Sequence, residues 1–219
     1  DQVLVLKPPF LGGWSDSTFF HSSNSFKEEV KKLTYVRGAT GSNRVPGMEL
    51  GTAYDVHRTD DKTSNRYVVR NWGVNYDFIQ LYNIKMLAGR DFVRTDHRIR
   101  FNEIQNIILS ASAVRLLGFS SPQEAIGKKV FAFNKNWDVV GVTSDFHQKS
   151  LRHPVEPTFF LPVSGPNNSF SIRIAPENLS QPIAAIRKKY ETFFPGKPGQ
   201  CCFARLNRSM PESSGLTKN

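Results

Sequence analysis

Asp145 and His147 are the residues in this chain whose types and spacing come closest to catalytic chemistry. Residues two apart on a strand point to the same face, so this carboxylate and imidazole could act as an acid–base pair. No Gly-x-Ser-x-Gly segment or other recognisable nucleophile motif accompanies them. A hydrogen-bonded strand end is the favoured interpretation, a hydrolase is a rival one, and we expect no active site.

Metal, redox and nucleotide chemistry are also not predicted. His147 and His153 stand six residues apart and lack the spacing of a helical zinc motif. Cys201 and Cys202 are adjacent, so on a strand they point to opposite faces and do not form a bridge. The Gly-Lys pair at 127–128 is not followed by the Ser or Thr of a phosphate-binding loop. We therefore expect no metal and no cofactor.

The charge of the chain leaves a second class of function open. The 219 residues include 29 Lys and Arg against 19 Asp and Glu, a formal net charge of +10. Such an excess favours polyanionic partners, so a basic polyanion- or nucleic-acid-binding module is the alternative hypothesis. The basic residues are scattered, however, and no RNA-binding or zinc-finger signature is present. A solvated basic surface without a nucleic-acid partner is the favoured interpretation.

Two polar segments are candidate contact surfaces for a protein partner. Residues 93–103 are strongly polar and predict an exposed loop, and residues 134–136 predict a hairpin turn. From this polarity alone, the candidate partner contacts are residues 95–100 of the loop and the turn at 134–136, and among them Arg98, Arg100 and Lys135.

Both ends of the chain predict β-α-β units. The first has a strand at 2–7, a helix at about 24–33 that begins with a capping box at Ser25 and Glu28, and a strand at 35–45. The last part has strands at 158–163, 170–175 and 201–206, with a helix before Pro195. Because residues 1–7 read as a strand, no signal peptide is expected, and no apolar run approaches the 20 or so residues of a membrane span.

The middle of the chain is mostly β. Strands are predicted at 67–70, 106–109, 128–133 and 137–145, with short helices capped by Ser110 and Ser121. Two β-α-β pieces that flank a β-rich block favour an α+β fold, a split β-α-β sandwich with an insertion. The tail at 209–219 is polar and is expected to be disordered or foreign to the native protein.

Several segments, in order, resemble the periplasmic core domain of MacB-like ABC transporter permeases, in the MacB/FtsX-like family and especially its Bacteroidetes-type members. The segments are the Val-Pro-Gly turn at 45–47, Leu-Ala-Gly-Arg-Asp-Phe at 87–92, Ala-Ile-Gly-Lys at 125–128, the run from 139 to 151, and Val-Glu-Pro at 155–157. The residues that carry the motifs are Pro46, Gly47, Gly89, Arg90, Asp91, Gly127, Gly141, Asp145, Phe146, His147, Ser150, Leu151 and Pro157. Ser110 departs from the Asn usual in the family, and the chain diverges from the family after Phe203.

The resemblance implies a non-catalytic domain on the periplasmic side of the inner membrane, between the first two membrane helices of a permease. It implies a porter-like subdomain made of residues 1–47 and 156–208, and a sabre-like inserted subdomain at 48–155. The implied role is to couple ATP-driven conformational change to export or to periplasmic partners. The implied partners are the rest of the permease, its dimer mate, the ABC ATPase and, in some branches, an adaptor protein or a lipoprotein. In this interpretation the motif residues are structural.

Overall fold

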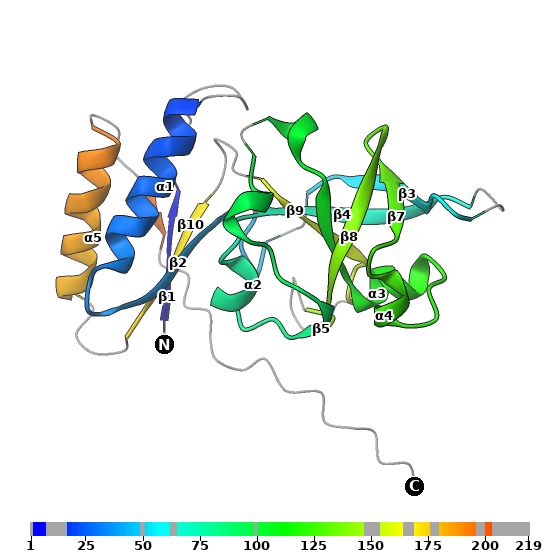
Figure 1. Ribbon diagram of the computed structural model, residues 1–219. Helices are drawn as coiled ribbons and strands as arrows, with labels where there is room; N and C mark the ends of the chain where they lie inside the picture. The colour runs from blue at the N-terminus through cyan, green and yellow to red at the C-terminus, as the bar shows by residue number, and fades with distance from the viewer. Residues whose placement is uncertain are drawn as a thin grey trace, which may run out of the picture.

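The computed structural model describes residues 2–7, 17–48, 51–61, 65–98, 100–146, 154–163, 169–175, 180–195 and 200–202. Only the backbone is described for residues 200–202. The chain forms two lobes that lie side by side (Figure 1). One lobe is built from both ends of the described chain and the other from its middle. This is the α+β architecture that the sequence predicts.

The first lobe is a four-stranded antiparallel sheet with two helices on one face (Figure 1). Its strands are β1 (Gln2–Lys7), β2 (Val36–Ser42), β10 (Ser169–Ile174) and β11 (Gln200–Cys202), in the order β11-β1-β10-β2. Its helices are α1 (Ser17–Lys31) and α5 (Ser180–Phe193). Strands from the two ends of the chain thus share one sheet, as in a split β-α-β arrangement.

Aromatic packing holds the helices to this sheet. Phe26 of α1 is fully buried, with its ring 4.9 Å from the ring of Phe170 and 5.7 Å from that of Tyr190. The predicted capping box at Ser25 is wrong, because α1 begins at Ser17 and Ser25 lies inside the helix. The additional turns bury Phe19 in the same core, and this packing extends the helix beyond the local capping signal.

The second lobe contains a closed ring of six strands. They are β3 (Ala53–Arg58), β4 (Tyr67–Val74), β6 (Asn106–Ser110), β7 (Lys129–Ala132), β8 (Lys135–Thr143) and β9 (Thr158–Pro162). The pairing runs β4-β3-β7-β8-β6-β9 and returns to β4. A short strand, β5 (Met86–Gly89), pairs with the last residues of β8, Gly141–Thr143, beyond the part of β8 that pairs with β7. Because the ring closes, no barrel strand needs the first lobe to complete its pairing.

Short helices and 3-10 turns decorate the barrel. They are α2 (Phe78–Leu81), α3 (Ala111–Leu116), α4 (Pro122–Ala125), η1 (Arg94–Asp96) and η2 (Phe101–Glu103). The predicted caps are confirmed: the hydroxyl of Ser110 accepts from the amide of Ala113 at 3.2 Å, and that of Ser121 accepts from the amide of Glu124 at 3.2 Å. Among the described residues, no helix is both long and apolar enough to cross a bilayer.

Alternating side chains give the barrel two cores. Residues that point inward, such as Trp137 and Phe159, fill the barrel. Their outward neighbours on β4, β6 and β9, among them Trp72 and Phe160, form a second aromatic layer beneath α2. Strands β6 and β9 and the last three residues of β4 are therefore buried on both faces, whereas Val68 near the start of β4 is exposed.

The structure differs from the predicted strands and their grouping at β3 and β9. Strand β3 was not predicted, although Tyr54 and Val56 alternate with polar residues. Strand β9 pairs with β4 and β6, in the second lobe. The division into 1–47 with 156–208 and 48–155 stays a prediction as a statement about domains. Residues 203–219, which include the tail, lie outside the described residues.

Candidate functional site

Two motif glycines allow strands β5 and β8 to approach closely. Gly89 and Gly141 are partners across this pair, and Gly89 has a φ of +68°. A Cβ on Gly89 would collide with the carbonyl oxygen of Val140, and one on Gly141 with that of Arg90. Only glycine therefore fits at either position without movement of the backbone.

Arg90, in the same motif, holds a buried carboxylate. Its guanidinium donates to the two oxygens of Asp96 at 2.6 and 3.1 Å, and the side chain of Asp96 is 5% exposed. Asp96 also accepts from the amide of Val93 at 2.8 Å and from the side-chain nitrogen of Asn106 at 2.6 Å. Burial raises the pKa of Asp96, but hydrogen bonds from Arg90 and these other donors outweigh it and lower the pKa. Asp96 was not predicted to be buried, because it stands in a mostly polar segment that predicted an exposed loop.

The predicted contact loop is fixed at both ends. Asp96 fixes its start, and the amine of Lys135 donates to the carbonyl oxygens of Asn102, at 2.8 Å, and Ile104. Arg98 and Arg100 are exposed between these two points. Lys135 thus has a structural role in positioning the loop. Its role as a partner contact stays a prediction, as do those of Arg98 and Arg100.

Residues 93–103 are only partly exposed. Val93 and Phe101 are 46% and 45% exposed, with the ring of Phe101 also packed 5.5 Å from that of Trp137, whereas Asp96 and His97 are buried. Burial lowers the pKa of His97 to about 3, so its imidazole is neutral at physiological pH. The loop therefore presents cations and two apolar side chains on a fixed backbone.

Asp145 binds a helix terminus and does not lie on a strand. Strand β8 ends at Thr143, so the shared strand face predicted for Asp145 and His147 is wrong. The carboxylate of Asp145 accepts from the amide of Ser112 and from Arg115, both at 2.6 Å. Phe146 is buried in the outer aromatic layer. His147, Ser150 and Leu151 lie outside the described residues.

The remaining motif residues form turns and strand ends. Pro46 and Gly47 occupy the centre of a turn in which the amide of Met48 donates to Val45 O at 3.1 Å, and Gly47 has a φ of +94°. Gly127 has a φ of +76° and donates to Val139 O at 2.9 Å. The carbonyl of Pro157 accepts from the amide of Arg70 at 2.9 Å and so begins the β4–β9 pairing. The structural role that the resemblance implies for the motif residues stays a prediction.

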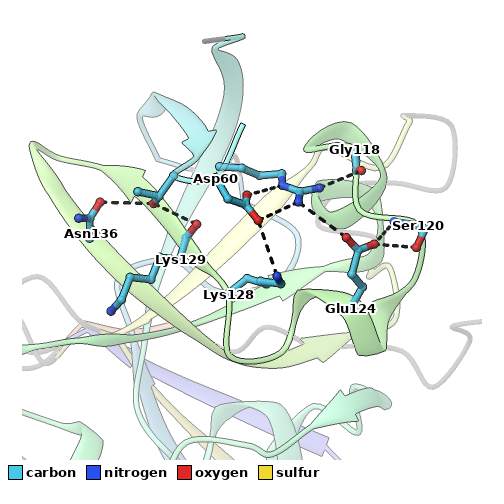
Figure 2. Close-up of polar contacts among 9 residues, drawn as sticks. Asp60, Gly118, Ser120, Glu124, Lys128, Lys129 and Asn136 are labelled. Carbon is cyan, nitrogen blue, oxygen red and sulfur yellow. Dashed lines mark hydrogen bonds and ion pairs between the residues drawn. The ribbon is translucent and has the colours of Figure 1, made fainter. Parts of the chain in front are cut away.

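A polar network ties the outer end of the β3–β4 hairpin to the barrel (Figure 2). Arg58 donates to both oxygens of Asp60, at 2.9 and 3.0 Å, and to the carbonyl of Gly118 at 3.1 Å. Glu124 lies 3.7 Å from Arg58 and accepts from the amide and hydroxyl of Ser120. Arg58 and Asp60 of the hairpin are thus tied to one other segment, at Gly118 and Glu124, although solvent screens the charges.

Strand β4 also joins the two lobes. Its last residue, Val74, pairs with Ser42 of β2, and the amide of Asn43 donates to Gly73 O at 2.9 Å. The indole of Trp72 donates to Arg44 O at 2.9 Å. These bonds run between backbone groups or to a fixed ring, so they hold the lobes in register.

Helix α1 makes a second connection between the lobes, which we call the α1 joint. The amine of Lys31 lies 2.9 Å from a carboxylate oxygen of Asp77, and the phenol of Tyr76 donates to Glu28 at 3.0 Å. Lys27 lies between them, 1% exposed, with its amine 5.4 Å from the centre of the Tyr76 ring. That amine has no hydrogen-bond partner among the described residues.

The electrostatics of the α1 joint are set by burial. Desolvation lowers the pKa of Lys27 to about 7, against the opposing effect of Asp77. Burial, with a smaller contribution from Asp77, raises the pKa of Asp91 to about 6. Neither Lys27 nor Asp77 was singled out from sequence. The only available signal was that Lys27 follows Phe26 directly and lies three residues before Val30, at the edge of the apolar stripe of this helix.

Two hollows flank the α1 joint. One, of about 530 Å³, is lined on one side by α1 and on the other by Tyr76, Arg94 and His97. The second, of about 490 Å³, lies between the end of α1, the start of β2 and α2. Among the described residues, no group of His, Cys, Asp and Glu is arranged to hold a metal ion. The polar and charged side chains that line these hollows can form ionic contacts and hydrogen bonds.

Comparison with known proteins gives a consistent result. Residues 3–188 match the model of the MacB-like periplasmic core domain. No curated protein matches.

Solved structures show the same fold at low sequence identity. The periplasmic region of MacB from Actinobacillus actinomycetemcomitans superposes with a TM-score of 0.61 at 13% identity, over 92% of this chain and 88% of that one. A domain of a putative permease from Porphyromonas gingivalis has a TM-score of 0.58 at 13% identity, over 96% and 94% of the two chains. The extracellular domain of the noncanonic ABC-type transporter YknZ from Gram-positive bacteria has a TM-score of 0.53 at 13% identity, over 89% and 92%.

Proposed function

The chain belongs to the MacB-like periplasmic core domain family and is a periplasmic domain of an ABC transporter permease, and we propose that it carries ATP-driven movement from the membrane to periplasmic partners. In this proposal the domain performs no chemistry of its own, and its residues transmit displacement. The full-length protein lies in the inner membrane, and this domain joins its first two membrane helices.

One observation carries the proposal: the N-terminal end of β1 and the C-terminal end of β11 lie at the same end of one sheet. Gln2 of β1 pairs with Ile174, and β11 runs from beside Lys7 toward the Gln2 end of β1. A domain placed between two consecutive membrane helices needs its entry and exit on one side. The first lobe meets this requirement, and the second lobe is then an arm attached at β2.

The connection between the lobes suits transmission. Backbone bonds from β2 to β4 resist displacement along the strands, and the α1 joint supports the barrel at a second point. Two separate connections restrict rotation more than a single linker does. A shift of the first lobe would therefore reach the exposed loop at 93–103.

The proposed partners are the permease's own membrane helices, its dimer mate, the ABC ATPase and an adaptor protein or lipoprotein. Loop residues Arg98 and Arg100, beside the exposed ring of Phe101, form the surface best placed to meet such a partner. Aromatic rings and arginines are favoured at protein interfaces.

The test uses the full-length permease with its ATPase, with Cys201 and Cys202 replaced by Ser. A spin label at Arg100→Cys reports the distance between the two copies in a dimer, with ATP and without nucleotide. We expect the distance to change when ATP is added, and to stay fixed when the ATPase carries a substitution that prevents it from binding ATP. A label at Lys188→Cys, on the exposed side of α5, is the matched control for movement of the first lobe. An identical distance distribution at Arg100 in every nucleotide state would refute coupling.

A further inference from the structure

The second hollow, which lies between the end of α1, the start of β2 and α2, is positively charged. Its charged lining consists of Lys31 on α1, Arg37 on β2, Arg173 on β10 and a single acid, Asp77. Three cations against one carboxylate leave an excess of positive charge in a space of about 490 Å³. The side-chain amides of Gln80 and Asn83 also line it and supply neutral donors.

Two of the cations are held in place by the surrounding structure. The guanidinium of Arg173 donates to Asn83 Oδ1 at 3.3 Å and to the carbonyl of Leu81, so it is fixed beside α2. The amine of Lys31 is held by Asp77 at 2.9 Å and by Glu28 at 3.2 Å. Arranging these cations before a ligand arrives reduces the entropy cost of binding.

Of the three basic residues that line the hollow, Arg37 is the one whose side chain can bind an added anion directly. Its side chain is exposed, and no hydrogen bond or ion pair joins it to another described residue. Most other basic groups near α1 are paired with acids, as Lys32 and Lys189 are with Glu29. Arg37 therefore offers a planar, doubly donating group that an anion could bind without breaking an existing contact.

The hollow lies at a particular end of the first-lobe sheet. Ile174 pairs with both Gln2 and Val36, so Arg173 and Arg37 are each one residue from the end at which β1 begins. Figure 1 shows the N-terminal end of β1 beside the connection from α1 to β2. Strand β11 runs toward this same end. In a domain between two membrane helices, this end faces the bilayer, an orientation that rests on the proposed function.

We propose that the hollow lined by Lys31, Arg37 and Arg173 binds the phosphate-bearing headgroup of an anionic phospholipid at the membrane surface. Arginine forks match phosphate oxygens in pairs, and the lysine amine adds a point charge. The formal net charge of +10 adds a general attraction to an anionic surface. The contact would fix the height and tilt of the first lobe relative to the bilayer.

The experiment measures co-sedimentation of the 219-residue chain with vesicles. One set contains phosphatidylcholine alone, and the other contains phosphatidylcholine mixed with phosphatidylglycerol. We expect binding to the mixed vesicles only, weakening as salt is added. Each basic side chain near an anionic surface contributes about fivefold to binding, so Arg37→Gln should weaken it about fivefold and Arg37→Glu by more.

The matched control is Arg100→Glu, an equal change of charge on the second lobe at a side chain that is 75% exposed. Equal losses for Arg37→Glu and Arg100→Glu would show that net charge alone drives binding, and would overturn the site. Inorganic phosphate that shifts the amide resonance of Gly38, without any vesicle binding, would overturn the lipid assignment.

Failure here is separable from failure of the proposed function. The vesicle assay uses the isolated chain and needs no ATPase, so a negative result leaves coupling intact. Conversely, an unchanged spin-label distance in the permease leaves the vesicle result as it stands.

Discussion

Replacing Lys27 with Met should stabilise the protein at neutral pH. Lys27 is 1% exposed, and its amine has no hydrogen-bond partner among the described residues. The charged groups that act on it are Asp77, Glu28, Lys31 and Arg94, and the buried imidazole of His97 lies near the same ring. Methionine keeps the length and apolar stem of the side chain while removing the amine.

The magnitude follows from the pKa of Lys27, which falls from 10.5 to about 7. That difference corresponds to about 5 kcal/mol of preference for the neutral amine in the folded protein. It is an upper limit on the gain, because local opening of the joint lets the amine reach water. Loss of the amine–ring contact with Tyr76 subtracts about 1 kcal/mol.

The sign depends on pH. From about pH 7 to 10.5 the unfolded chain holds a proton that the folded protein releases, so the parent becomes more stable as the pH rises. The advantage of Lys27→Met should therefore be largest at pH 7 or below and shrink toward pH 10.5. Urea unfolding followed by tryptophan fluorescence at several pH values measures it.

Lys32→Met, at a side chain that is 70% exposed, is the control and should change the free energy of unfolding by less than about 0.5 kcal/mol. A Lys27→Met protein that is less stable than the parent at pH 7 would refute the reasoning. So would a difference that is the same at pH 7 and pH 10.

Other substitutions test the remaining structural claims. Gly89→Ala should cost several kcal/mol in thermal unfolding, because of its positive φ and the collision with Val140 O, whereas Gly118→Ala, with a φ of +76° and open space, should cost about 1 kcal/mol. Asp96→Asn should cost about 1 to 2 kcal/mol at neutral pH, because an amide cannot accept from all the donors of Asp96 while the half-exposed Arg90 remains in contact with solvent. Because the folded pKa of Asp96 is lowered, that contribution is present above its unfolded pKa and is lost as the pH falls through the folded value, so acid titration of both proteins should converge. Arg58→Ala should accelerate amide hydrogen exchange at the hairpin tip while changing the free energy of unfolding by about 1 kcal/mol or less. Binding of DNA by the chain at low salt would support the polyanion alternative, and its absence there would remove it.

Local signals in the sequence predicted the local structure well. The hydroxyls of Ser110 and Ser121 fix the starts of short helices through contacts within three residues, and both caps were predicted. Where tertiary packing decides, local signals failed. The capping pattern at Ser25 does not start the helix, because burial of Phe19 in the core extends α1 back to Ser17.

The closed barrel and the α1 joint depend on long-range pairing. Nothing within β9 specifies that it lies parallel to β4, more than 80 residues earlier, since its buried run suits any central strand. Lys27 looks like any other helical lysine until Tyr76 covers it. The candidate site thus became visible only when distant segments were placed together.

The barrel strands occupy one uninterrupted stretch of the chain, from Ala53 to Pro162, and their pairing closes on itself. As the chain is synthesised from its N-terminus, the barrel can therefore complete its pairing before β10 and β11 arrive to join β1.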